Sequence, residues 1–181
     1  TISDIVFGIA PRINAAGRIE HGKLAVDLLV EKNRETAANL AEGIEALNKK
    51  RRELDQDVTK EAIGMIDANK KSTVVYSPNW HKGVVGIVAS RLIETYYKPT
   101  IVLAEKDGEL TGSARSVKGF DLYNAILQCK KHLEKFGGHK YAAGLTLNKE
   151  NLQDFIDAFE KTVADTITDE QLTPEVSIDM E

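Results

Sequence analysis

A long stretch without proline, Asn33 to Asn69, is the feature that most limits how this chain can fold. Apolar residues recur in it at spacings of three, four or seven, the period of one helix face: Leu40, Ile44, Leu47, Leu54, Val58 and Met65. Arg51 and Glu61 interrupt this stripe, and Asn33 is a candidate N-cap. At 1.5 Å per residue the helix would be roughly 50 Å long. A compact domain of this size does not need so long a helix for its own packing, so we expect it to join two lobes.

After Lys71 the pattern predicts an α/β domain, a mixed β-sheet flanked by helices. The expected strands are 72–77, 98–105, 110–116 and 142–147, with a hairpin turn "KDGE" at 106–109. The expected helices are 84–97, 119–136 ended by Gly137 and Gly138, and 148–167 capped by Asn148. The order is therefore β-α-β-β-α-β-α.

Four divisions of the chain follow from this pattern. They are 1–33, short helices around a glycine- and arginine-rich turn; 34–70, the long helix; 71–167, the α/β domain; and 168–181, a linker that ends inside a possible strand at 175–180.

The composition, 42% hydrophobic and 29% charged residues, is that of a globular protein. The net charge of −4 hides an uneven distribution, because one of the 24 basic and ten of the 28 acidic residues lie in 150–181. Residues 1–149 therefore carry 23 basic and 18 acidic side chains, which is compatible with binding a polyanion. No apolar run is long enough for a membrane span and no signal peptide is recognisable, so we expect a cytoplasmic location.

Metal-binding and nucleotide-binding signatures are missing from the sequence. Cys129 is the only cysteine, which excludes an internal disulfide, and its apolar helical surroundings favour a core thiol. The four histidines are scattered, and neither a P-loop nor a dinucleotide-binding glycine fingerprint is present. The chain offers groups that bind anions but no set of ligands for a catalytic divalent metal, as expected of half an active site.

The segment "NWHKGVVGIVASR", 79–91, is a candidate anion site. It places His81 and Lys82 at a strand-to-helix junction, where free N–H groups and the helix dipole favour an anion, and Gly83 lets a phosphate approach the backbone. The alternative interpretation makes Trp80 a core anchor, Gly86 a packing residue and His81 a solvated loop residue.

Two further candidates contain arginine. In a strand, Ser113 and Arg115 would share one face, so a hydroxyl and a guanidinium could bind one phosphate together. In "PRINAAGR", Arg12 and Arg18 are separated by an expected loop of small residues. The alternatives are a solvated strand face and a helix cap with two surface arginines.

The fourth candidate is "FGGHKYAAG", 136–144. Gly137 and Gly138 could simply end a helix. A helix stop does not require His139 or the three small residues Ala142, Ala143 and Gly144. These small residues would leave room for a ligand beside the His139 imidazole.

Four motifs, in this order, resemble the RecJ family of single-strand-specific 5′→3′ DNA exonucleases in the DHH phosphoesterase superfamily. They are "FGIAPRINAAGR" (7–18), "WHKGVVGIVASR" (80–91), "GSARS" (112–116) and "FGGHKYAAG" (136–144). The glycine-glycine-histidine element alone is shared with oligoribonuclease and cyclic-dinucleotide phosphodiesterases and with a C-terminal part of alanyl-tRNA synthetases.

The resemblance, which covers about residues 5–147, implies an architecture. The chain would begin at the end of a metal-binding DHH domain, include the connecting helix and the DHHA1 domain, and stop where an OB-fold domain begins. The catalytic ions, Mn²⁺ or Mg²⁺, would be bound by the DHH domain, and none is expected in this chain. The chain alone would be inactive.

The resemblance also implies roles for individual residues. Ser113 and Arg115, with Arg12 or Arg18, would bind the 5′-terminal phosphate next to Gly137 and Gly138. His81 and His139 would contact the scissile phosphate as the catalytic histidines. Trp80 or Tyr141 could stack on a base, although core packing suits both. The implied partners are single-stranded DNA, the protein's own DHH domain and single-strand-binding protein.

Two other functions are compatible with the sequence. One is the DHHA1 part of an oligonucleotide or cyclic-dinucleotide phosphodiesterase, for which "PRINAAGR" and "WHKGVVGIVASR" would not be expected. The other is a non-catalytic interaction module whose acidic C-terminal helix binds a basic partner.

Overall fold

The computed structural model describes residues 1–175 and 178. The chain divides into two compact units, Thr1–Asp57 and Val58–Glu181, and the long helix α3, Arg34–Ile63, contributes to both. No helix in the described part of the chain is long and apolar enough to cross a membrane.

The first unit is helical. A π-helical segment, Asp4–Ile9, continues into α1, Ala10–Ile19, and is followed by α2, Lys23–Val30, and by the first part of α3. Its small core consists of Ala16, Ala25, Ile44 and Leu47, with Ile13, Ile19, Leu24 and Leu28 packed against it.

Two sequence-based expectations for this unit meet different outcomes. The predicted cap is confirmed, because the side-chain oxygen of Asn33 accepts a hydrogen bond from the Thr36 N–H at 3.0 Å. The expected glycine- and arginine-rich turn is wrong, since most of that segment forms α1. Pro11 at the start of α1 and the buried Ala15 and Ala16 explain the helix, because proline suits a first helical turn and alanine suits a helix interior.

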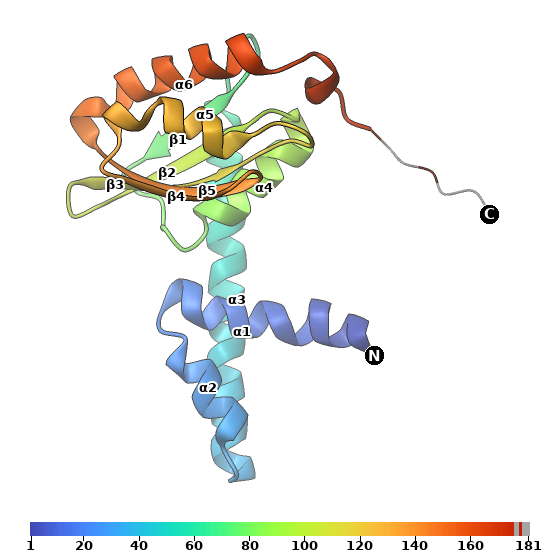
Figure 1. The fold of residues 1–181 in the computed structure, drawn as a ribbon. Helices are drawn as coiled ribbons and strands as arrows, with labels where there is room; N and C mark the ends of the chain where they lie inside the picture. The colour runs from blue at the N-terminus through green and yellow to red at the C-terminus, as the bar shows by residue number, and fades with distance from the viewer. Residues whose placement is uncertain (176–177, 179–181) are drawn as a thin grey trace. The chain divides into compact units, whose positions relative to one another are not determined.

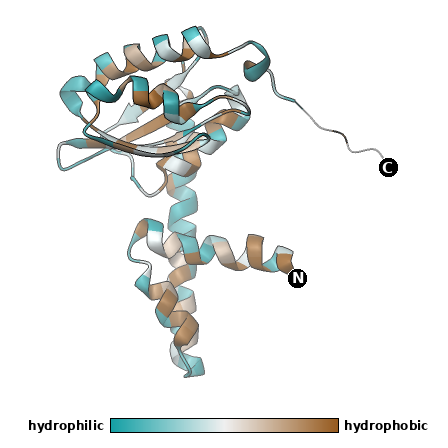
Figure 2. Cartoon of the chain, viewed as in Figure 1, coloured by the Kyte–Doolittle hydropathy of each residue, from teal (hydrophilic) through white to brown (hydrophobic). Residues whose placement is uncertain are grey.

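Many apolar side chains of the first unit are exposed. Figure 2 shows hydrophobic residues along the N-terminal segment and α2. They are Ile2, Ile5, Val6, Phe7, Ile9, Val26, Leu29 and Val30. This apolar surface is typical of an interaction site.

The second unit is built on a five-stranded sheet in the order β1-β2-β3-β5-β4. The strands are β1, Thr73–Ser77; β2, Thr100–Lys106; β3, Glu109–Arg115; β4, Lys135–His139; and β5, Ala142–Asn148. Only β1 and β2 pair in parallel, so the sheet is mixed, as the sequence predicted. The β2–β3 hairpin turns at Asp107 and Gly108, whose φ angles of 54° and 84° fit the two-residue turn expected there.

Helices cover both faces of the sheet (Figure 1). α4, Val85–Tyr96, packs on β2 and β3. α5, Leu122–Gln128, and α6, Leu152–Thr166, pack on the opposite face, where the main core lies. Fully buried members of this core include Leu103, Leu110, Leu147, Phe155 and Phe159. Short 3₁₀ turns occur at Lys130–His132, Lys149–Asn151 and Glu170–Leu172.

Three expected boundaries are wrong. α3 ends at Ile63 rather than near residue 69. α5 ends at Gln128, and Gly137 and Gly138 belong to the edge strand β4 instead of a helix terminus, so a strand is added to the predicted order. The side-chain amide of Asn148 donates to Glu134 instead of capping α6, whose N-cap position is Asn151. The possible strand at 175–180 falls largely outside the described residues.

The segment between α3 and β1 is held by side chains of its own unit. The Glu160 carboxylate accepts hydrogen bonds from the Lys71 and Ser72 N–H groups, at 2.8 and 2.9 Å, and from the Ser72 hydroxyl. The buried Trp80 indole donates to Glu61 on the last turns of α3 at 2.7 Å. Trp80 is therefore a core anchor and is not available to stack on a base.

Candidate nucleic-acid interface

Ser113 and Arg115 form a preorganised pair on β3. The two side chains lie on the same face of the strand, as their spacing predicted. One terminal nitrogen of Arg115, Nη1, donates to the Ser113 hydroxyl oxygen and to the Ala114 carbonyl oxygen, both at 2.8 Å. The half-buried guanidinium is thereby held over its own strand, with a hydroxyl beside it. This is a suitable arrangement for binding a phosphate.

Gly86, in the first turn of α4, lies directly over this pair. A Cβ atom at Gly86 would be 3.1 Å from both the Arg115 Nη2 and the Ser113 Oγ. The N-cap residue of α4, Val84, provides no side-chain hydrogen bond to the first turn. The positive end of the helix dipole thus lies beside a hydroxyl and a guanidinium, and all three favour an anion.

His81 lies in the loop that leads from β1 into α4. Its Nδ1 accepts a hydrogen bond from the Gly83 N–H at 3.0 Å, so the neutral ring carries its proton on Nε2. The half-buried imidazole can therefore act as a hydrogen-bond donor while it also orders the loop before α4.

The register of the sheet places two further predicted residues, Gly137 and His139, on the face of Ser113 and Arg115, and it places Gly138 on the opposite face. Ser113 pairs with Gly144, which pairs with Gly137, and Arg115 pairs with Ala142, which pairs with His139. Directly paired residues share a face. His139 is exposed on β4, two strands and thus about 10 Å from Arg115. The structure therefore brings together Ser113, Arg115, Gly137 and His139 around a strip of sheet with very small side chains.

Gly137 and Gly138 have different reasons to be glycine. Gly138 has a φ of +149°, and a Cβ there would lie 2.5 Å from the Cα of Ala143 and closer still to the carbonyl oxygen of Ala142. The backbone itself requires this glycine. A Cβ on Gly137 would meet no atom within 4 Å. Packing within the unit does not require Gly137, so its missing side chain leaves free space on the exposed sheet face.

Arg12 and Arg18 belong to the first unit and lie on α1. Arg12 forms an ion pair with Glu45 on α3 through its Nε, and its Nη1 donates to the Gly8 carbonyl oxygen at 2.6 Å. Arg18 is exposed in the last turn of α1. These two arginines thus belong to a different unit from Ser113 and Arg115.

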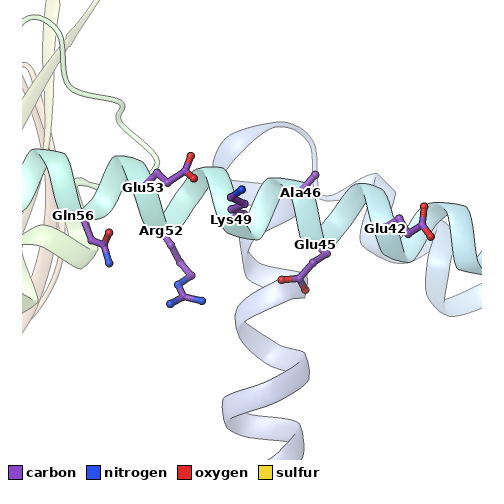
Figure 3. A pocket seen from close by; sticks show the side chains of 7 residues that line it. All are labelled: Glu42, Glu45, Ala46, Lys49, Arg52, Glu53 and Gln56. Atoms are coloured by element: carbon purple, nitrogen blue, oxygen red, sulfur yellow. The ribbon is translucent and has the colours of Figure 1, made fainter.

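A hollow of about 560 Å³ on α3 also lies in the first unit (Figure 3). Its lining side chains all come from α3: Glu42, Glu45, Ala46, Lys49, Arg52, Glu53 and Gln56. Three carboxylates and two basic groups make it a poor phosphate site, because the negative charges outnumber the positive ones. We therefore do not assign the candidate phosphate site to this hollow on α3.

The described residues contain no group of three or more His, Cys, Asp or Glu side chains able to hold a metal ion. The candidate interface therefore does not fit a divalent ion, and its own chemistry is that of cationic and hydrogen-bonding groups. Cys129 is buried, which confirms the predicted core thiol, and this burial raises the pKa of the thiol.

Sequence reasoning missed one residue of this site. Gly86 was interpreted only through helix packing, although it contacts the Ser113–Arg115 pair. The signal available was its position one turn into a helix that follows a glycine-containing loop. For Tyr141 the sequence left base stacking and core packing open, and core packing is wrong, because the side chain is 44% exposed in the turn between β4 and β5.

Comparison with known proteins gives consistent results. The DHHA1 domain family matches residues 69–165. The single-stranded-DNA-specific exonuclease RecJ of Bacillus subtilis (strain 168) is 40% identical over 179 residues, covering 96% of this chain and 23% of the relative. RecJ of Escherichia coli (strain K12) is 36% identical over 189 residues, covering 98% of this chain and 33% of the relative. The chain thus spans a third or less of the length of these curated relatives.

A solved structure supports the same relationship. RecJ from Thermus thermophilus, in complex with Mn²⁺, matches with a TM-score of 0.84 and 31% identity over 91% of this chain and 25% of that one. The α/β fold and the resemblance stated from the motifs are confirmed. This chain belongs to the DHHA1 domain family and is, over nearly its whole length, a relative of the RecJ exonucleases.

Proposed function

We propose that this chain is the substrate-binding part of a single-stranded-DNA-specific 5′→3′ exonuclease that acts in DNA repair and recombination. In this proposal Ser113 and Arg115 bind the 5′-terminal phosphate of the strand. The observation that carries the proposal is the Ser113–Arg115 pair, joined at 2.8 Å and lying beside the first turn of α4. A guanidinium, a hydroxyl and a helix N-terminus lie close together there, and each of them favours a phosphate.

The remaining site residues have supporting roles in the proposal. His139 is aligned with Arg115 across β3, β5 and β4, and His81 lies before α4. Both histidines donate hydrogen bonds to the scissile phosphate or its neighbours. Gly137 leaves room for the DNA backbone, and Gly138 allows β4 to approach the backbone of Ala142 and Ala143 on β5.

This chain would contribute positioning and charge stabilisation to the reaction. The divalent ion, Mn²⁺ or Mg²⁺, would be bound by a DHH domain of the same protein, outside the residues described. The exposed apolar surface of the first unit supports contact with that domain. Single-strand-binding protein is a further proposed partner, and the cytoplasm the proposed location.

The DHHA1 part of an oligonucleotide or cyclic-dinucleotide phosphodiesterase is the alternative. RecJ similarity over nearly the whole chain favours the exonuclease, because that similarity extends beyond the shared glycine-glycine-histidine element.

The proposal is tested by binding of the 181-residue chain to fluorescent single strands at several salt concentrations. We expect weak binding that favours a 5′-phosphorylated strand, weakens as salt rises and resists competition by a cyclic dinucleotide. Incubation with Mn²⁺ should release no nucleotides. Binding that ignores both the 5′-phosphate and salt would contradict the proposal, as would efficient hydrolysis.

A further inference from the structure

Tyr141 is exposed in a way that core packing does not explain. Among the described residues, only Phe7 and Tyr141 are aromatic side chains classed as exposed, and Tyr141 alone belongs to the sheet unit. Within that described part of the chain its hydroxyl forms no hydrogen bond. An exposed aromatic ring without a packing role is a candidate contact for a ligand.

The backbone of Tyr141 is fixed next to the phosphate site. Tyr141 lies in the two-residue turn between β4 and β5, one residue before Ala142, the partner of Arg115 on β5. Its carbonyl oxygen accepts a hydrogen bond from the Ser116 N–H at 3.0 Å, directly after Arg115. The other turn residue, Lys140, is held in the same way by the Leu122 N–H at 3.0 Å. The turn is thus tied to the end of β3 and to the start of α5.

The side chains of the turn combine an aromatic ring with a cation. The ammonium group of Lys140 lies 5.6 Å from the centre of the Tyr141 ring. Single-stranded nucleic acids are bound by such combinations, in which bases stack on aromatic rings and cations contact the phosphates.

We propose that Tyr141 stacks on the base of the nucleotide whose 5′-phosphate Ser113 and Arg115 hold, and that Lys140 binds the following phosphate. This inference rests on the proposed function. It assigns a base platform to a residue of the turn, whereas the phosphate site lies on β3 and α4. Stacking tolerates any base, so the platform would bind the terminal nucleotide without sequence preference.

The test compares two 5′-phosphorylated strands, one with a base on its first nucleotide and one with an abasic first nucleotide. We expect Tyr141→Ala to weaken binding of the strand with the base by about 5- to 150-fold, the equivalent of 1–3 kcal/mol per stacked base. The same change should leave binding of the abasic strand nearly unaltered. Tyr141→Phe keeps the ring and should bind both strands like the unaltered chain.

Two further variants complete the experiment. Tyr141→Trp adds an exposed indole whose fluorescence should be quenched by the strand with the first base and not by the abasic strand, while Trp80 stays buried. Leu127→Ala removes another exposed apolar side chain, on α5, and should change neither affinity. Equal losses on both strands for Tyr141→Ala, or no loss on either, would overturn the inference.

The same titrations separate this inference from the proposed function. If the unaltered chain prefers 5′-phosphorylated strands but Tyr141→Ala makes no difference, the stacking role alone is refuted. If the unaltered chain binds no single strand, the proposed function is refuted as well.

Discussion

Gly86 on α4 and Ser113 on β3 approach so closely that a Cβ on the glycine would lie 3.1 Å from the serine hydroxyl oxygen. The same Cβ would lie 3.1 Å from the Arg115 Nη2. Because Gly86 has no side chain, α4 can lie this close to the hydroxyl and the guanidinium. A larger residue at this position would push against both groups of the proposed phosphate site.

Gly86→Ala should therefore weaken phosphate binding without destabilising the fold. The added methyl group displaces the Arg115 guanidinium, and we expect an affinity loss of about tenfold, or 1.4 kcal/mol, for 5′-phosphorylated strands. Alanine favours the helix by up to about 1 kcal/mol, so the thermal midpoint should not fall. Fluorescence anisotropy and thermal unfolding measure the two effects. Unchanged affinity would show that Gly86 serves packing alone.

The neighbouring glycines of β4 should behave in opposite ways. Gly138→Ala forces a side chain into backbone atoms at a φ of +149°. We therefore expect the free energy of unfolding to fall by about 1–3 kcal/mol. Gly137→Ala meets no atom and should leave stability nearly unchanged while it weakens binding of single strands. Urea unfolding and anisotropy on both variants provide the measurement. Equal stability of the two variants would contradict this division of roles.

Local sequence signals account for much of the sheet unit but not for β4. The Asp107–Gly108 turn predicted its hairpin because few other residues adopt positive φ angles easily. The β4 segment contains two glycines and no β-branched residue, so it carries no local strand signal. Its strand conformation comes from backbone pairing with β5, which a local pattern does not reveal.

The candidate site was predictable to a similar extent. The spacing of Ser113 and Arg115 placed both on one face, because strand side chains alternate. The positions of Gly86 and Tyr141 near this pair depend on contacts between distant segments, α4 with β3 and the β4–β5 turn with Ser116. Such contacts follow from tertiary packing and not from the residue types alone.

Glu160 should be important for stability. Its carboxylate accepts hydrogen bonds from two backbone N–H groups and from the hydroxyl of the buried Ser72. Glu160→Ala leaves these donors without their partner, and we expect a loss of about 2–3 kcal/mol in urea unfolding. Asp165→Ala, at an exposed position of the same helix, is the control and should change stability by less than about 0.5 kcal/mol. Similar effects of both variants would contradict a special role for the Glu160 hydrogen bonds.

Glu105 should add a small acid-sensitive contribution to stability. Two hydrogen bonds lower the pKa of the Glu105 carboxyl below its ordinary value. The one from the Tyr76 hydroxyl has the larger effect, and the one from the Lys149 ammonium group has the smaller effect. A carboxyl with a lowered pKa stabilises the fold above its unfolded-state pKa, and this stability is lost as the pH falls through the folded-state value. The difference in thermal midpoint between the unaltered chain and Glu105→Gln should therefore shrink as the pH is lowered from neutral through that range. A difference independent of pH would contradict this prediction.

The central claim, that Arg115 and Ser113 hold the terminal phosphate, is tested most directly by Arg115→Ala with strands that differ only in a 5′-phosphate or a 5′-hydroxyl group. Removing a charged hydrogen-bond donor should weaken binding of the phosphorylated strand by about 10- to 150-fold, or 1.5–3 kcal/mol. The 5′-hydroxyl strand should bind almost as before, and Arg91→Ala, an exposed arginine on α4, should keep the 5′-phosphate preference. An equal loss on both strands, or an intact preference for the phosphorylated strand in Arg115→Ala, would contradict the account.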